Sequence, residues 1–261
     1  MKKALLTVFA AIAMLFATPV WAAEMPVKAP PAPVAPPVIY DWSGFYGGVG
    51  AGWSRGSFDW TFLNPAPVTC CTAFSVSETD TVLSGIFGAQ VQFGFFVIGA
   101  EATVSDFINN NFATNNLCNV LVPPVHCGVR LRDTDTFGGR GGFTWTNWLF
   151  YGEGGWARTA VNSRLSRVSP TATDPIADNF SVNKDGTYWG AGIDYMAGTF
   201  THVAFIMGVE YQHINFGTET HFSSVDTFNQ CLPSAFSCRS ISAKEDIVRV
   251  RLTAKWNPFY P

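Results

Sequence analysis

Seven charged residues stand singly in segments where large apolar residues alternate with small or polar ones. They are Glu101, Arg140, Glu153, Asp194, Glu210, Arg249 and Arg251. In a β-strand successive side chains point to opposite faces, so this alternation places each charge on the face away from the large apolar residues. Carboxylates and guanidiniums gathered on one inner face would either pair as salt bridges or line a narrow charged passage for ions.

A second candidate for chemistry is the run GWSRG at residues 52–56, which matches the G-x-S-x-G nucleophile pattern. That pattern requires a strand, a tight turn and a helix, with an acid and a histidine later in the chain. Here it falls at the end of a predicted strand, and no helix is predicted after it. The favoured interpretation is an ordinary strand segment, so we expect no catalytic residue and no enzyme activity.

The histidines are scattered along the chain, at His126, His202, His213 and His221. Glu219 and His221 could share a metal if their loop folded suitably, but a second ligand pair with metal-site spacing is missing. Haem could be captured by His126 or His221 beside Phe222 and Phe228, although the spacing does not require it. We expect solvated histidines, with neither a metal nor a cofactor.

The elements that position the charges are strands with a period of two. In residues 41–54 (DWSGFYGGVGAGWS), Phe45, Val49 and Trp53 share one face, whereas Tyr46 and several glycines share the other. A membrane barrel is apolar outside and small or polar inside, as this segment is. Similar alternation predicts eight strands, at residues 41–54 (continuing toward 62), 79–91, 96–105, 131–145, 149–162, 186–196, 202–216 and 245–256.

The composition agrees with an all-β protein that faces lipid. Charged residues make up 13%, aromatic residues 15%, and the formal net charge is −3. A chain with so much apolar content is not expected to be disordered. A soluble enzyme usually carries a larger fraction of charged residues. The chain also has no excess of basic residues that would indicate nucleic-acid binding. The predicted fold class is an eight-stranded antiparallel up-and-down transmembrane β-barrel. Short turns at residues 93–95, 146–148 and 197–201 alternate with long loops after residue 62 and at 106–128, 163–178 and 217–240.

The first residues predict export. Lys2 and Lys3 precede an apolar run and then small residues before Ala22, which indicates a secretory signal peptide over residues 1–22. Residues 23–40 are rich in proline and are expected to form an extended tether in the periplasm. The barrel is assigned to residues 41–256, and residues 257–261 are a C-terminal extension. An even number of strands places both chain ends in the periplasm.

All six cysteines fall in the loops predicted to be external. These are Cys70 and Cys71, Cys118 and Cys127, and Cys231 and Cys238. In an exported protein an even number of cysteines suggests disulfides, and Cys118–Cys127 and Cys231–Cys238 are the natural local pairs. Cys70 and Cys71 either join other loops or bridge each other through a strained link.

A signal peptide, a proline-rich segment and then DWSGFYGG at residues 41–48 resemble the small outer-membrane immunogenic proteins of alphaproteobacteria. Further matching pieces are VIGAEA at 97–102, GAGIDY at 190–195, GVEY at 208–211 and DIVRVRL at 246–252. The resemblance implies a porin-like eight-stranded barrel, similar to opacity proteins and the OmpA transmembrane domain. Members usually end at an aromatic residue that the assembly machinery recognises; Trp256 takes that place here, with residues 257–261 after it. Members are described as porins, surface antigens or haem binders, and the resemblance does not choose among these.

These observations predict a non-enzymatic barrel in the Gram-negative outer membrane, with a structural envelope role and disulfide-tied external loops. The expected partners are outer-membrane lipid, the barrel assembly machinery and an extracellular ligand at the loops, and no nucleic acid. The alternatives are a small porin passing ions or solutes through a charged lumen, and haem or host-factor binding by the loops. Eight strands leave an interior that side chains can fill. The inward glycines, however, leave room for water and keep the porin alternative open.

Overall fold

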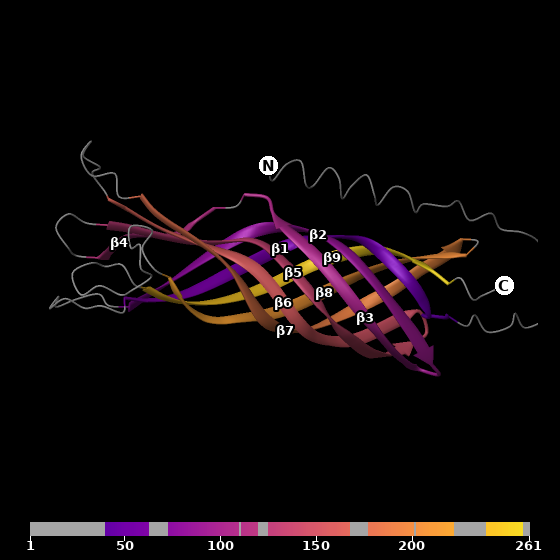
Figure 1. Ribbon diagram of the computed structural model, residues 1–261. Helices are drawn as coiled ribbons and strands as arrows, with labels where there is room; N and C mark the ends of the chain where they lie inside the picture. Colours follow the sequence, from indigo (N-terminus) through magenta and orange to yellow (C-terminus); the bar gives the residue numbers. More distant parts are fainter. Residues whose placement is uncertain are drawn as a thin grey trace, which may run out of the picture. The chain divides into compact units, whose positions relative to one another are not determined.

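The computed structural model describes residues 40–62, 73–109, 111–119, 125–167, 177–200, 202–221 and 239–257. The signal peptide and nearly all of the tether predicted from the sequence therefore lie outside these ranges. The strands are β1 (Gly44–Phe62), β2 (Ala73–Phe93), β3 (Phe96–Phe107), β4 (Ala113–Asn119), β5 (Val125–Trp145), β6 (Trp148–Arg167), β7 (Ala177–Phe200), β8 (Val203–His221) and β9 (Arg239–Trp256) (Figure 1). Within the described ranges, no helix is long and apolar enough to cross a membrane.

Eight of these strands form a closed antiparallel ring, which confirms the predicted up-and-down barrel. The order around the ring is β1, β2, β3, β5, β6, β7, β8 and β9, with β9 pairing back onto β1. Val49 of β1, for example, lies opposite Leu252 of β9. β4 is not part of the ring. It pairs with β5 between Val125 and Val129, at the end toward the long connections, while β3 pairs with β5 between Asp133 and Phe143.

The strands extend further toward the long connections than the sequence pattern predicted. β5 begins at Val125 instead of 131, β7 at Ala177 instead of 186, and β9 at Arg239 instead of 245. The segments expected to be loops at 106–128, 163–178 and 217–240 therefore hold β4 and the outer ends of other strands. Beyond the belt the outward face of a strand meets water and is polar, while the inward face is apolar and buried, as at Val129, Ile241 and Ala243. The apolar-out alternation that marks a membrane strand is therefore reversed there, although the ladder continues.

The turn expected at residues 197–201 is also largely strand. β7 continues to Phe200 and pairs with β8 as far as Val203, with a register shift between Met196 and Gly198. A shift of this kind interrupts the period of two, because one extra residue moves the following side chains to the other face. The pattern was therefore lost at residue 196, where the strand was predicted to end.

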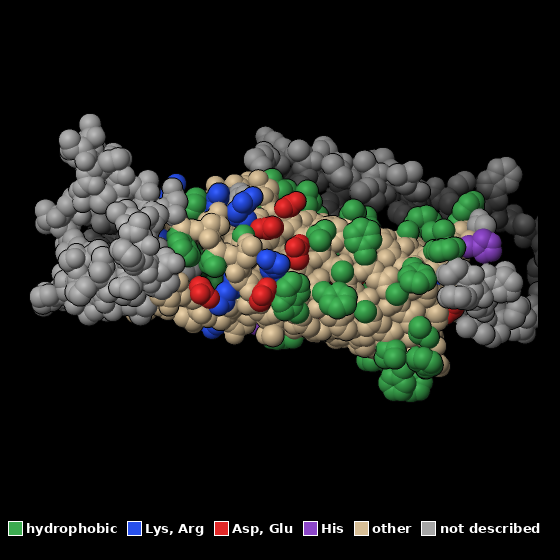
Figure 2. All heavy atoms as spheres, in the orientation of Figure 1, with side chains coloured by type: hydrophobic (Ala, Val, Ile, Leu, Met, Phe, Trp, Pro, Cys, Tyr) green, Lys and Arg blue, Asp and Glu red, His purple; other side chains and the backbone are tan. Residues whose placement is uncertain are grey.

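The outward face carries an apolar belt. On β1 it runs from Phe45 through Val49 to Trp53, which are 53%, 63% and 65% exposed. This length agrees with the roughly 9–11 residues that a tilted strand needs to cross a bilayer. On β9 the belt runs from Val248 to Trp256. Apolar side chains are spread along the barrel surface, and charged ones gather beside them toward one end (Figure 2). We infer that the belt faces lipid.

Inside the barrel, two apolar clusters lie at different levels. The mouth cluster, near the ends of the strands at the short turns, consists of Trp42, Val97, Leu149, Tyr151, Met196, Ala204 and Ile206. The outer cluster lies toward the long connections, and its largest members are Phe58, Trp60, Phe107, Tyr188 and Phe216. The lumen is therefore packed with side chains at both levels.

The expectation that every cysteine lies in a loop is wrong for two of the six. Cys118 falls in β4 and Cys127 in β5. Cys127 is buried and disulfide-bonded, and it is the one cysteine whose side chain the structure describes. The other predicted partners lie outside the described residues or have undescribed side chains, so both proposed pairings stay predictions.

Candidate functional site

The seven charged residues singled out from the sequence all lie inside the barrel at the level of the apolar belt, and we call them the charged layer. They come from β3 (Glu101), β5 (Arg140), β6 (Glu153), β7 (Asp194), β8 (Glu210) and β9 (Arg249 and Arg251). Glu210, Arg249 and Arg251 are each 1% exposed. The alternation that turns the apolar residues to lipid turns these side chains inward.

Arg251 is the centre of the charged layer. Its Nη2 lies 2.7 Å from Oε2 of Glu101, and its Nη1 also binds Glu210. Its Nε lies 3.6 Å from Oδ1 of Asp194. One guanidinium thus links carboxylates from β3, β7 and β8, which is possible because its five N–H groups form a planar fork.

The other two arginines complete the pairing. Arg140 lies 2.9 Å from Oε2 of Glu101 and 2.8 Å from Oδ2 of Asp194. Arg249 Nε donates to Oε1 of Glu210 at 2.8 Å, and its Nη1 donates to Ser84 Oγ at 3.1 Å. Each guanidinium of the charged layer therefore has a carboxylate partner, as the low dielectric of the interior requires.

Two tyrosines, which were not predicted from the sequence to interact with the charged layer, form hydrogen bonds with its carboxylates. Tyr46 OH donates to Oε2 of Glu101 at 2.7 Å, and Tyr151 OH donates to Oε2 of Glu210 at 2.7 Å. The Arg140 guanidinium also lies 3.8 Å from the centre of the Tyr151 ring. Alternation alone placed Tyr46 inward, but which carboxylate it would reach depends on how strands far apart in sequence meet across the lumen.

The same tyrosines occupy the space over inward glycines. Tyr46 lies opposite Gly88, and Tyr151 lies opposite Gly192. A Cβ added to Gly88 would come 2.2 Å from the Tyr46 ring, and one added to Gly192 would come 2.3 Å from the Tyr151 hydroxyl. The expectation that inward glycines leave room for water is therefore wrong here, because neighbouring rings fill that room.

Glu153 differs from the other members of the charged layer. Gln212 Nε2 donates to its Oε1 at 2.7 Å, and among the described residues it has no guanidinium partner. Oxygens of Glu101, Glu153 and Glu210 lie within 4.8 Å of one another, close enough to share a cation. Arg251 already contacts two of the three, so a guanidinium supplies the positive charge that a metal would bring.

The G-x-S-x-G segment is part of β1, which continues as a strand to Phe62. Ser54 is buried, and its Oγ donates to Oε1 of Glu245 at 2.6 Å, while Thr134 donates to Oε2 of Glu245 at 2.8 Å. A strand, and not a helix, follows the serine as far as Phe62, so the turn from strand to helix that activates a nucleophile is not formed at this serine. The sequence missed Glu245 as an inward residue, although it alternates in phase with Arg249 and Arg251.

The remaining candidates are dispersed. His213 is on the outer face, with Nδ1 2.7 Å from Oδ1 of Asp246, and His202 is exposed beside the β7–β8 turn. Glu219 pairs with Lys184. The side chains of His221, Phe222 and Phe228 lie outside the described part of the chain, so the metal and haem alternatives that involve them stay untested.

Comparison with curated proteins gives one kind of relative, while no family model matches the chain. The 31 kDa outer-membrane immunogenic protein of Brucella melitensis is 29% identical over 205 residues, covering 72% of this chain and 79% of the relative. The protein of the same name from Brucella suis gives the same values. The chain resembles an outer-membrane immunogenic protein. The barrel, its apolar belt and this relative together indicate an outer-membrane β-barrel of a Gram-negative bacterium.

Solved structures with a similar course of the chain are also outer-membrane proteins. OprG from Pseudomonas aeruginosa is 11% identical, with 82% of this chain and 97% of that chain covered and a TM-score of 0.41. The protease OmpT from Escherichia coli is 6% identical, with 84% and 99% covered and a TM-score of 0.43. The attachment invasion locus protein of Yersinia pestis is 7% identical, with 80% and 99% covered and a TM-score of 0.38. Similarity at this level carries no information on function.

Proposed function

We propose that this protein is a closed, non-conducting and non-enzymatic barrel that acts as a surface and envelope protein of the outer membrane. The observation that carries the proposal is the filled lumen. From the short-turn end outward, the mouth cluster, the charged layer and the outer cluster follow one another inside the barrel. In this proposal the protein's contacts with the surroundings are made by its outer strand ends and long connections.

The charged layer favours the hypothesis of a closed lumen, and not that of a pore. Arg140, Arg249 and Arg251 are 4%, 1% and 1% exposed. Arg249 is held by Glu210 of the neighbouring strand β8, whereas Arg140 and Arg251 are also held by carboxylates of strands that are not their neighbours in the ring. An ion would have to displace these buried pairs, and breaking one such pair costs about 3–5 kcal/mol. The porin alternative therefore requires a rearrangement of the charged layer.

The lengths of the strands support a surface role. β1 and β2 stay paired as far as Thr61 and Ala73, well beyond the end of the apolar belt at Trp53. β5 and β6 stay paired as far as Val125 and Arg167. The long connections would thus be held away from the lipid on stiff ladders. In the proposed arrangement Cys118–Cys127 and Cys231–Cys238 tie these connections, both chain ends are periplasmic, and the ligand is an extracellular molecule.

Single-channel recording in a planar bilayer tests the proposal. Refolded wild-type protein is compared with Arg140→Ala, and with Arg158→Ala as a control that removes an exposed cation from the outer face of β6. Heat-modifiable migration on a gel verifies that each sample is folded. We expect no openings from the wild type. Steady openings whose size changes in Arg140→Ala but not in Arg158→Ala would replace this proposal with the porin alternative.

A further inference from the structure

The chain just before β1 places a tryptophan side chain inside the barrel. Trp42 is 0% exposed and packs in the mouth cluster against side chains of β3, β6, β7 and β8. Between Trp42 and β1 stands Gly44, whose φ of +134° is a conformation that side chains rarely adopt. A Cβ at Gly44 would also lie 2.4 Å from the carbonyl oxygen of Trp256. Glycine at this position is therefore required for the indole to enter the lumen.

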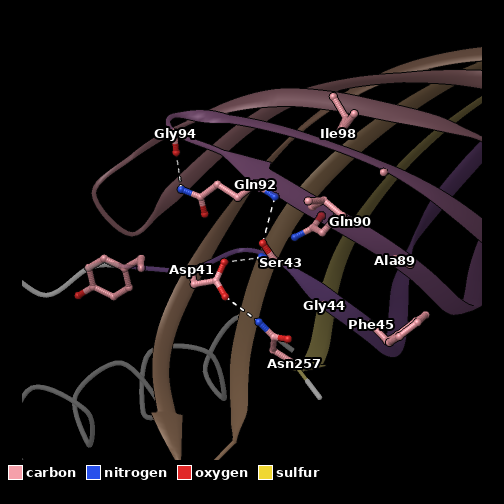
Figure 3. Close-up of a pocket in the computed structure, with 13 residues that line it drawn as sticks. Asp41, Ser43, Gly44, Phe45, Ala89, Gln90, Gln92, Gly94, Ile98 and Asn257 are labelled. Atoms are coloured by element: carbon pink, nitrogen blue, oxygen red, sulfur yellow. Dashed lines mark hydrogen bonds between the residues drawn. The ribbon is translucent and has the colours of Figure 1, made fainter. Parts of the chain in front are cut away.

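Side chains of β2 hold the main chain of this segment. Trp42 N donates to Oε1 of Gln92 at 2.7 Å, and Gln90 Nε2 donates to the Trp42 carbonyl at 2.8 Å. The Gln92 backbone N–H also donates to Ser43 Oγ at 3.1 Å (Figure 3). The N–H and C=O of Trp42 are thus both satisfied by amide side chains, outside the β-ladder.

Side chains at the end of β9 hold the same segment from the other side. Lys255 donates to the carbonyl oxygens of Asp41 and of Ser43, the second at 2.9 Å. Asn257 Nδ2 donates to Oδ2 of Asp41 at 2.8 Å (Figure 3). We call Asp41, Trp42 and Ser43 the latch, because they bind to β2 and to the end of β9, the two strands that flank β1 at the mouth of the barrel.

We propose that this mouth is a binding site for an extended peptide segment that carries an indole, and that the latch occupies it in cis. The site combines an apolar surface for the ring, two glutamines for the main-chain N–H and C=O, and an ammonium for two carbonyl oxygens. These are the elements by which an extended peptide is recognised in general: main-chain hydrogen bonds and a side-chain pocket.

The latch can leave without opening the barrel wall. β1 pairs with β9 from Phe45 and Trp256 onward, and Asp41, Trp42 and Ser43 take no part in that ladder. A hollow of about 850 Å³ borders the latch and is lined by Asp41, Gln92 and Asn257 among others. The hydrogen bonds that Asp41 makes with Ser43 and Asn257 are only partly buried, whereas the one between Gln90 and Trp42 is buried. Release of the latch would open this end of the lumen to water, whether or not the charged layer beyond it conducts.

The experiment uses a reporter thiol in the mouth cluster of the full chain. Ala204, which is 3% exposed in that cluster, is changed to cysteine, and its labelling by a water-soluble maleimide is followed by mass spectrometry of the peptide containing residue 204. We expect slow labelling with the latch intact and labelling at least about tenfold faster in Trp42→Ala, because the site is then open part of the time. Free indole should restore the protection of Trp42→Ala by filling the vacated space.

Trp256→Ala is the matched control, since it removes an indole at the same end that is 52% exposed on the lipid side. Its labelling should stay slow and should not respond to indole. Fast labelling with the latch intact, or equal labelling rates with and without Trp42, would contradict the proposal that the latch closes the mouth of the barrel. If labelling of Trp42→Ala is faster and added indole does not slow it, the proposal that the mouth binds an indole is contradicted.

If Trp42→Ala does not give folded, heat-modifiable protein, the double variant Gln90→Ala and Gln92→Ala replaces it. This variant keeps the indole and removes the side chains that hold the Trp42 main chain. We then expect faster labelling that an added excess of a Tyr-Asp-Trp-Ser-Gly peptide does not reverse, since the glutamines that would hold the peptide are gone. Slow labelling of this variant, or protection of it by the peptide, would overturn the proposal.

Discussion

The Arg251 guanidinium on β9 donates to the Glu101 carboxylate on β3 at 2.7 Å, although β1 and β2 lie between these strands in the barrel wall. The two residues are 150 positions apart in the sequence. Their contact crosses the lumen and connects strands that share no backbone hydrogen bonds. The charged layer therefore braces the barrel from inside, in addition to the ladders that form its wall.

Arg251→Met should destabilise the barrel strongly. The substitution leaves Glu101 and Glu210 without one of their buried partners, and breaking a buried ion pair in this way costs about 3–5 kcal/mol. Urea unfolding in detergent micelles, followed by tryptophan fluorescence, measures the change. Arg158→Met, at an exposed position on the outer face of β6, should change stability by no more than about 0.5 kcal/mol. Equal effects of the two variants would show that the layer does not brace the barrel.

Gly192→Ala should be destabilising, whereas Gly198→Ala on the same strand should not. A Cβ at Gly192 would meet the Tyr151 hydroxyl at 2.3 Å, while a Cβ at Gly198 would have nothing within 4 Å. Overpacking of a filled interior typically costs about 1–3 kcal/mol. The urea midpoints of the two variants test this difference. A neutral Gly192→Ala would mean that the Tyr151 ring can move aside, and that the lumen is less tightly filled than we infer.

Val49→Arg tests whether the apolar belt faces lipid. Val49 is 63% exposed in the middle of the belt, and Arg at the midplane of a bilayer costs a transmembrane barrel about 2–4 kcal/mol. Thr61→Arg, on the same face of β1 beyond the belt, should cost little because that position is exposed to water. Folding into lipid vesicles at increasing urea concentration gives both values. Similar costs for both variants would contradict the placement of the belt in the membrane.

The hydrogen bonds of Asp41 should make the latch sensitive to acid. Partial burial acts to raise the pKa of Asp41, but hydrogen bonds from Ser43 and Asn257 and the charge of Lys255 outweigh it and hold the pKa below the ordinary 3.8. Because the folded state favours the carboxylate, its stabilising contribution is fully present above 3.8 and is lost as the pH falls through the lower folded-state pKa.

The difference in urea midpoint between wild type and Asp41→Asn measures this contribution. We expect a constant difference at pH values well above 3.8 and a shrinking one below it. A difference that grows on acidification would have the wrong sign and would mean that Asp41 is bound in its protonated form. Asp59→Asn, on the exposed outer face of β1, is the control for general effects of acid.

Much of the barrel could be predicted from the sequence, because the side of the wall to which a side chain points depends only on its position along its own strand. Alternation placed Val49 and Trp53 outward, and it placed Arg140, Glu210 and Arg251 inward. It failed beyond the belt, where water replaces lipid and the apolar face of a strand is the inner one. There Leu131, Ile241 and Ala243 are buried inside the barrel. β5 continues beyond its predicted start to Val125 and β9 to Arg239. The register shift after Met196 ended the predicted strand early for a different reason, because an extra residue breaks the period of two.

The contacts inside the lumen were decided by the tertiary structure. Which carboxylate Arg251 reaches depends on the stagger and curvature of the whole ring, since its partners lie on β3, β7 and β8. The entry of Trp42 into the mouth depends on Gln90 and Lys255, which come from β2 and β9. A period of two assigns a side chain to the inside or the outside of a barrel. Its neighbours across the lumen are set only when the ring closes, because that closure fixes the distances between strands far apart in the chain.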